Sequence, residues 1–224
     1  MGIAKGVREV GYFDCVGGGQ IVVDGNYAYI GHVDKTTGTT IVDVSDPKKP
    51  REVANVPTAP GIHAHKVRVG NGLMLVNREH PPRMKGPPLT AEELAQPVGL
   101  GVYDVSDPKR PKEITTWRCG GNGVHRFTFD GRYAYISPEI DGYLGNIVMI
   151  LDMKNPSKPE EVGRWWMPGQ WTAGGETPTW KGRAHRCHHP IRMGDRLYTS
   201  YWHGGAVILD ISDMSKPKCV GAID

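Results

Sequence analysis

The chain has 224 residues and a formal net charge of +3, with charges of both signs scattered along it. It has no Lys/Arg run of the kind that marks a nucleic-acid partner, and no apolar run approaches the roughly 20 residues needed to cross a bilayer. The four cysteines stand far apart, which favours thiols over disulfides. We therefore expect a cytoplasmic protein that binds neither nucleic acid nor membrane.

The first predicted element is a strand over residues 8–13, which looks like the last strand of a repeat and has no partners before it. A hairpin follows, because Asp24-Gly25 lies between two runs rich in β-branched and aromatic residues. The run Ile-Val-Asp-Val-Ser-Asp-Pro at 41–47 then joins a third strand to a short fourth strand at 51–53. These elements predict one four-stranded unit.

The same unit returns three more times. Its signature reappears at 102–111, 149–159 and 207–217, each time after a hairpin signal and before a short strand. Repeated sets of four short strands are typical of β-propeller blades. We predict an all-β chain, with residues 1–224 forming a single propeller or propeller portion of four blades plus the orphan strand. Because this does not close a ring, we expect a longer chain, or a second chain such as another copy in a homo-oligomer, to complete it.

Two long insertions interrupt the repeats, at 77–99 and at 163–184. In the first, Thr90 and Glu93 form a capping box that predicts about two turns of helix. The second carries four of the six tryptophans, which could wall an apolar or aromatic substrate or could seal blades together. Since neighbouring strands of a blade reverse direction, both insertions should lie on one face, where we expect a small-molecule substrate.

Histidines cluster where the first strand of three units should begin: His63, His65, His125, His185, His188 and His189. A gapless alignment makes His65, His125 and His189 equivalent, and a one-residue gap replaces His189 by His188. Strand starts of this kind lie beside the propeller axis, so three blades would aim imidazoles at one point. We predict a divalent transition metal, Fe, Cu or Zn, held by these histidines. The alternative is that they only hydrogen-bond neighbouring blades and close the ring.

Other side chains near these strand starts and in the insertions could act on a substrate: His63, His185, Arg126, Glu139 and Glu176. Glu79 follows the second strand of its unit as Glu139 follows that of the next. A carboxylate beside a metal could serve as a general base. Each carboxylate taken alone could equally be a solvated loop charge.

The four Ile-Val-Asp-Val-Ser-Asp-Pro-like units resemble the LVIVD-repeat family of β-propeller proteins over nearly the whole chain. The resemblance implies a larger ring of about seven blades, with further histidine-bearing blades beyond the part matched here. The axial histidines are more distantly similar to those of selenium-binding protein/methanethiol oxidase and of carotenoid cleavage oxygenases, where imidazoles hold copper or iron. We therefore expect a metal-dependent enzyme acting on a small organic substrate, with an oxidoreductase ahead of a hydrolase or lyase. The alternative is a non-catalytic binding or scaffold module.

Overall fold

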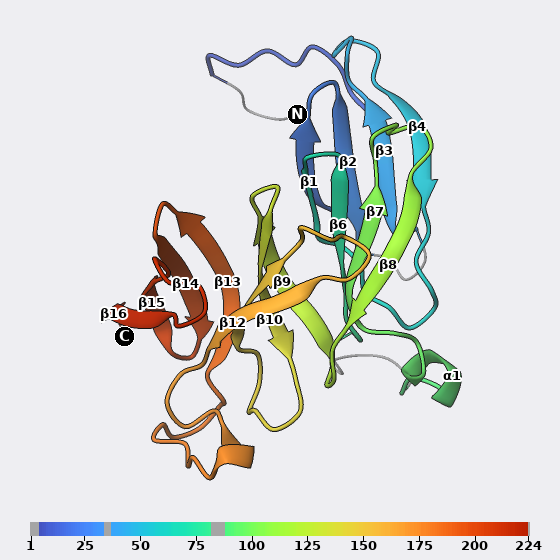
Figure 1. The fold of residues 1–224 in the computed structure, drawn as a ribbon. Helices are drawn as coiled ribbons and strands as arrows, with labels where there is room; N and C mark the ends of the chain where they lie inside the picture. Colours follow the sequence, from blue (N-terminus) through green and yellow to red (C-terminus); the bar gives the residue numbers. More distant parts are fainter. Residues whose placement is uncertain (1–4, 34–36, 82–87, 224) are drawn as a thin grey trace.

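The structure, a computed structural model, describes residues 5–33, 37–81 and 88–223. It contains four four-stranded antiparallel sheets (Figure 1). The first contains β1 (Gly18–Asp24), β2 (Tyr27–His32), β3 (Thr39–Asp43) and β4 (Arg51–Val56). The second contains β5 (Val67–Gly70), β6 (Leu73–Arg78), β7 (Gly99–Asp104) and β8 (Lys112–Arg118). The third contains β9 (Gly123–Phe129), β10 (Tyr133–Glu139), β11 (Val148–Asp152) and β12 (Glu160–Trp165). The fourth contains β13 (Arg186–Met193), β14 (Arg196–Trp202), β15 (Gly205–Asp210) and β16 (Lys218–Ile223).

Each sheet is a meander in which neighbouring strands follow chain order, and the sheets follow one another along an arc from the blue first sheet to the red fourth (Figure 1). Strand β1 contacts β5, β5 contacts β9, and β9 contacts β13. The first strands of successive sheets therefore lie side by side, as they do around a propeller axis. The prediction of an all-β fold built from four propeller blades is confirmed. Within the described residues, no comparably extensive contact joins the fourth sheet to the first.

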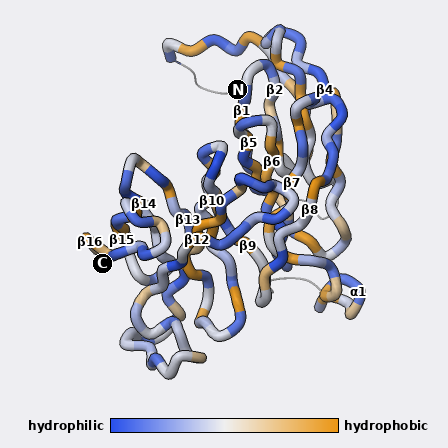
Figure 2. Tube along the Cα trace, in the orientation of Figure 1, coloured by the Kyte–Doolittle hydropathy of each residue, from blue (hydrophilic) through white to orange (hydrophobic). Residues whose placement is uncertain are grey.

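The apolar cores lie between successive blades. Along β10, Ala134 and Ile136 pack with residues of the second blade such as Leu75, whereas Tyr135 packs with residues of the fourth such as Leu197. Side chains of a strand alternate between its two faces, so an inner blade contributes to the core on each side. Figure 2 shows the hydrophobic residues concentrated along the strands.

The two end blades each present apolar residues to solvent. Ile21 and Val23 on β1 are 57% and 59% exposed, and Met193 and Ile223 in the fourth blade are 67% and 72% exposed. Equivalent faces between the inner blades are buried. The exposed faces are consistent with our expectation that more chain or a second copy completes the ring, which stays a prediction.

The expected orphan strand over residues 8–13 is wrong. The chain is not in a strand there, and Val10 and Phe13 instead line a groove on the first blade with Pro47. The approach is close, because a Cβ on Gly11 would collide with the carbonyl oxygen of Pro47. A strand is defined by its hydrogen-bonded ladder, and this segment packs its side chains against a sheet without joining one.

The two insertions leave the same face of the arc, the lower edge in Figure 1. The capping box of Thr90 and Glu93 is present, but α1 (Ala91–Leu94) makes about one turn rather than two. Pro97 accounts for the early end, because the residue before a proline is disfavoured in the helical region. The second insertion holds one turn of 3₁₀-helix, Thr172–Gly174. No helix among the described residues is long and apolar enough to span a membrane.

Candidate functional site

A β-bulge interrupts the first strand of the third and fourth blades close to its start. In the third blade, the ladder between β9 and β10 shifts so that His125 and Arg126 together oppose one residue. In the fourth, the shift falls between Cys187 and His189, so His188 is the extra residue. A bulge leaves a residue outside the ladder and re-aims its side chain. The bulges therefore release both histidines from the regular alternation of the sheet.

The first blade has the same irregularity, and the second blade begins its ladder just after the corresponding place. The ladder registers therefore give two series of equivalent positions. The first series is Gly19, His65, His125 and His188. The second series is Gln20, Lys66, Arg126 and His189. The alignment that made His189 equivalent to His65 and His125 is thus corrected. Arg196 pairs with Asp210 as Tyr133 pairs with Asp152 and Leu73 with Asp104, and counting back from these residues over equal lengths puts His188 rather than His189 in the position of His65 and His125.

Glu79, just after β6, is the carboxylate at the centre of these groups. Its Oε2 lies 3.0 Å from Nδ1 of His125, and its Oε1 accepts a hydrogen bond of 2.9 Å from Nζ of Lys66. Nδ1 of His63 lies 3.5 Å from Oε1. Glu79 and Lys66 are both buried. One carboxylate therefore joins the second blade to the third and contacts three basic side chains.

The protonation of this group follows from its contacts. Although burial by itself raises the pKa of Glu79, the hydrogen bond from His125, the close approach of His63 and the charge of Lys66 hold it below its usual range. Glu79 is therefore an ionised carboxylate, which can only accept hydrogen bonds. Nδ1 of His125 therefore donates to Glu79, and in the neutral imidazole Nε2 is the nitrogen that keeps the free lone pair.

The other imidazoles stack or lie edge to edge. The rings of His63 and His65 stack with centroids 3.9 Å apart, and those of His125 and His188 are 5.3 Å apart. Burial lowers the pKa of His65 to about 3 and the pKa values of His188 and His189 to about 4, and nearby cationic side chains add to this effect. All three are neutral at pH 7, which is the form that binds metal ions.

Four nitrogen atoms of the axial residues are buried without a hydrogen-bond partner: Nδ1 of His63, Nδ1 of His65, Nε2 of His189 and Nε of Arg126. Buried polar atoms are paired in the great majority of cases, so these exceptions require an explanation. In addition, one ligand atom each from His63, His65 and Glu79 lies within 4.8 Å of the others. Several imidazoles with one carboxylate form a donor set that suits zinc, copper or iron. The residue types present therefore suit the predicted metal. Among the described residues, however, the group whose ligand atoms lie this close is His63, His65 and Glu79, and not the predicted set of His65, His125 and His188.

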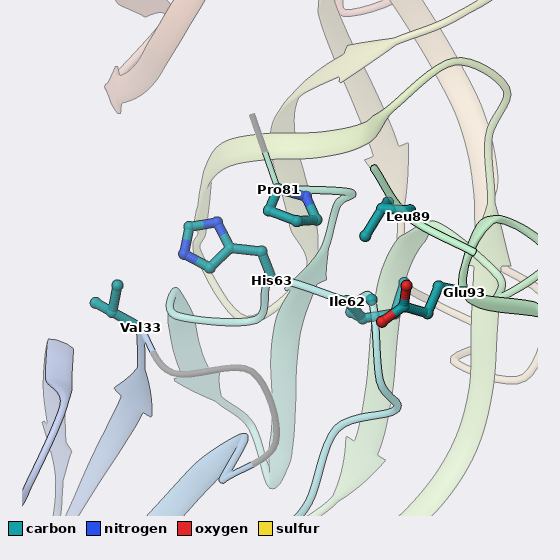
Figure 3. A pocket seen from close by; sticks show the side chains of 7 residues that line it. Val33, Ile62, His63, Pro81, Leu89 and Glu93 are labelled. Carbon is teal, nitrogen blue, oxygen red and sulfur yellow. The ribbon is translucent and has the colours of Figure 1, made fainter. Parts of the chain in front are cut away.

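A cavity of about 130 Å³ adjoins the cluster at His63 (Figure 3). Its other side chains are mostly apolar: Val33, Ile62, Pro81, Leu89 and Glu93. The carboxylate of Glu93 belongs to the capping box of α1, so its alkyl portion forms the wall. His63 is therefore the polar group of this cavity that also touches the histidine cluster.

The structure gives the predicted residues of the second insertion other partners. Glu176 accepts hydrogen bonds from the indole of Trp166 and from two backbone N–H groups of the same loop. His185 has its Nδ1 2.8 Å from the sulfur of Met167 and stacks on Trp180. These contacts organise the loop itself.

Glu139 lies apart from the imidazoles, because both of its oxygens accept from Nδ2 of Asn122, at 3.1 and 3.0 Å. The structure instead brings Glu79 to the cluster. Sequence reasoning placed Glu79 only among the carboxylates that follow a second strand. Glu139 holds the equivalent position, two residues after Ser137 as Glu79 is two residues after Asn77, so no local signal in the sequence could have singled out Glu79.

Comparisons with known proteins agree with the repeats. A family model described as LVIVD repeat matches residues 18–58, 128–166 and 193–224, half of the chain. Among solved structures, a protein from Lactobacillus plantarum is similar with a TM-score of 0.67 and 14% identity, over 92% of this chain and 57% of that one. The search of curated proteins found no match.

Two computationally designed proteins are also similar, each with a TM-score of 0.55. The match to Ika8, at 7% identity, covers 91% of this chain and 48% of Ika8, and the match to Ika4, at 8% identity, covers 92% and 99%. This chain thus spans about half the length of Ika8 and of the Lactobacillus protein. At these identities the likeness concerns the fold alone.

Proposed function

This chain belongs to the LVIVD-repeat family, and we propose that it is a metal-dependent enzyme that acts on a small organic substrate at the axial histidine cluster. Oxidoreductase chemistry stands ahead of hydrolase or lyase chemistry. The observation that carries the proposal is the shared register position of His65, His125 and His188 near the starts of the first strands of three successive blades. Three equivalent strand starts around one axis are a geometric reason for their imidazoles to converge.

In this proposal His65, His125 and His188 hold a divalent transition ion, iron, copper or zinc. When bound, such an ion polarises the substrate as a Lewis acid and, if it is iron or copper, can exchange electrons with it. Glu79 fixes the tautomer of His125, because its carboxylate accepts a hydrogen bond from the Nδ1–H group. Nε2 is then the nitrogen that can bind the metal. A carboxylate behind a ligating histidine is a common arrangement that orients the ring and raises its basicity.

The substrate would lie against His63, with its apolar portion in the adjoining cavity (Figure 3). The apolar walls exclude water from that portion and orient it. His63 keeps one nitrogen toward Glu79, so its Nε2 is the atom that would give a proton to the substrate or take one from it. These roles belong to the chain itself and hold for each of the three metals.

Elemental analysis of purified protein tests the proposal. We expect about one equivalent of iron, copper or zinc in the wild type and little in His125→Ala. His203→Asn is the matched control, because His203 is exposed and has a φ of 62°, which asparagine tolerates. It should keep the wild-type metal content.

Two results would change the proposal. Loss of metal in His63→Ala but not in His125→Ala would move the site to His63, His65 and Glu79, whose ligand atoms also lie close together. Metal-free wild type, folded and never exposed to chelator, would contradict the enzyme proposal. It would favour a non-catalytic binding or scaffold propeller, in which the hydrogen bonds of Glu79 serve only to join two blades.

A further inference from the structure

Arg126 differs from the other cations of the axial cluster in its partners. Lys66 is paired with Glu79, and the guanidinium of Arg68 donates to Oε1 of Gln20 at 2.7 Å. By contrast, Nε of Arg126 is buried without a hydrogen-bond partner. Among the described residues, no carboxylate lies within ion-pair distance of Arg126. The positive charge of Arg126 acts on neighbouring titratable groups, because it contributes to lowering the pKa values of Lys66 and His188.

The repeat shows what Arg126 lacks. Lys66 and Arg126 occupy equivalent positions, opposite Asn77 and Ser137. Each of these two blades has a glutamate two residues beyond that opposite residue. In the second blade this glutamate, Glu79, pairs with Lys66. In the third blade it is Glu139, whose two oxygens are taken by Asn122. Lys66 therefore forms an ion pair with the glutamate of its blade, whereas Arg126 forms none with the equivalent Glu139.

The cluster thus has an excess of positive charge. Lys66, Arg68 and Arg126 are opposed by the single carboxylate of Glu79, which the lysine already uses. Holding a partly buried guanidinium without a counter-ion costs free energy, and a bound anion recovers it. The planar fork of arginine matches a carboxylate, to which it can donate two parallel hydrogen bonds.

We propose that Arg126 binds a carboxylate group of the substrate, which is therefore a small organic acid. A carboxylate fits better than a phosphate, because one guanidinium suffices for a carboxylate and the neighbouring Lys66 and Arg68 are already engaged. The assignment of this acid as a substrate rests on the function proposed above. Its binding to Arg126 does not require the metal.

Titration of chelator-treated protein with benzoate tests the inference. Isothermal titration calorimetry gives the affinity, and the ¹H–¹⁵N signal of the Arg126 Nε–H reports directly on the side chain. We expect saturable binding, a shift of that signal, and at least a tenfold loss of affinity in Arg126→Gln. The matched control is Arg118→Gln, which removes the same charge from an exposed position at the end of β8. It should bind benzoate as the wild type does.

Arg126→Lys keeps the positive charge but lacks the planar guanidinium, so this variant should bind benzoate severalfold more weakly than the wild type. It replaces Arg126→Gln in the test if the glutamine variant does not fold. Wild-type affinity in a folded Arg126 variant would overturn the inference, and so would tighter binding of inorganic phosphate than of benzoate. If the protein binds benzoate but takes up no metal, the proposal of a metal-dependent enzyme is contradicted, whereas the carboxylate-binding site at Arg126 is supported. A metal-containing protein that does not bind benzoate would contradict the site alone.

Discussion

The second and third blades place the same kinds of side chain at equivalent positions and use them differently. In the second, Lys66 and Glu79 form a buried ion pair that also reaches His125 in the next blade. In the third, Arg126 and Glu139 occupy the same positions, but Glu139 turns to Asn122. Repetition of the sequence therefore repeats the positions of these groups without repeating their contacts.

The backbone explains part of the difference. The chain at Glu79 bridges to His63 on one side and to Gly123 on the other, which fixes its side chain between two blades. Gly123 has a φ of +103°, and a Cβ there would collide with the carbonyl oxygen of Arg78. Only glycine permits so close an approach. The chain at Glu139 bridges instead to Asn146 within its own blade.

The comparison predicts its largest effect on stability. Glu79→Gln should destabilise the protein by about 3 kcal/mol, because it leaves the buried Lys66 without a counter-charge. The matched variant Glu139→Gln should change stability by less than about 0.5 kcal/mol, since that side chain is only partly buried. Urea unfolding of both proteins measures the difference. Equal effects of the two substitutions would show that the blades do not differ as described.

A second prediction concerns the two histidines of the fourth blade. His188→Ala should weaken metal binding by about 100-fold, or about 2.7 kcal/mol, because His188 shares the register position of His65 and His125. His189→Ala should have little effect, since His189 occupies the position of Lys66 and Arg126. Competition with a metal-binding dye gives both affinities. A larger loss in His189→Ala would contradict the register and make His189 the equivalent of His65 and His125.

The smallest predicted effect lies on the opposite face, where the repeats do keep the same contacts. Asp43 accepts hydrogen bonds from the backbone and hydroxyl of Ser45, as Asp210 does from Ser212. Hydrogen bonds from Ser45, followed by the contact with Arg51, lower the pKa of Asp43 to about 2. An acid with a lowered pKa stabilises the fold above its unfolded pKa, here 3.8, and loses that contribution as the pH falls to about 2.

Asp43→Asn should therefore remove a small acid-sensitive part of the stability. Thermal unfolding from pH 6 to pH 2 should show the wild type losing its advantage over the variant between about pH 4 and pH 2. A constant difference over that range would mean that the pKa of Asp43 is the same in the folded and the unfolded protein, so that its contacts do not lower it.

The sequence alone predicted much of the site but not its connections. It placed His63, His65, His125 and His188 at strand starts, because the hairpin and Ser-Asp-Pro signals fix where each strand begins. It could not choose between His188 and His189, since it does not show whether Arg196 or Leu197 stands in the register of Tyr133. It also listed Glu79 and Glu139 as equals, because nothing local distinguishes them.

The sequence by itself determined the blades, since the two-residue alternation and the tight turns are properties of short segments. It also determined that imidazoles gather near the axis. Only the tertiary structure decided which groups touch. Glu79 reaches His125 because two blades approach closely at Gly123. Arg126 is left without a carboxylate because Glu139 accepts hydrogen bonds from Asn122 instead. Such contacts join residues of different blades and strands, so they depend on how the sheets pack and not on any one segment of the chain.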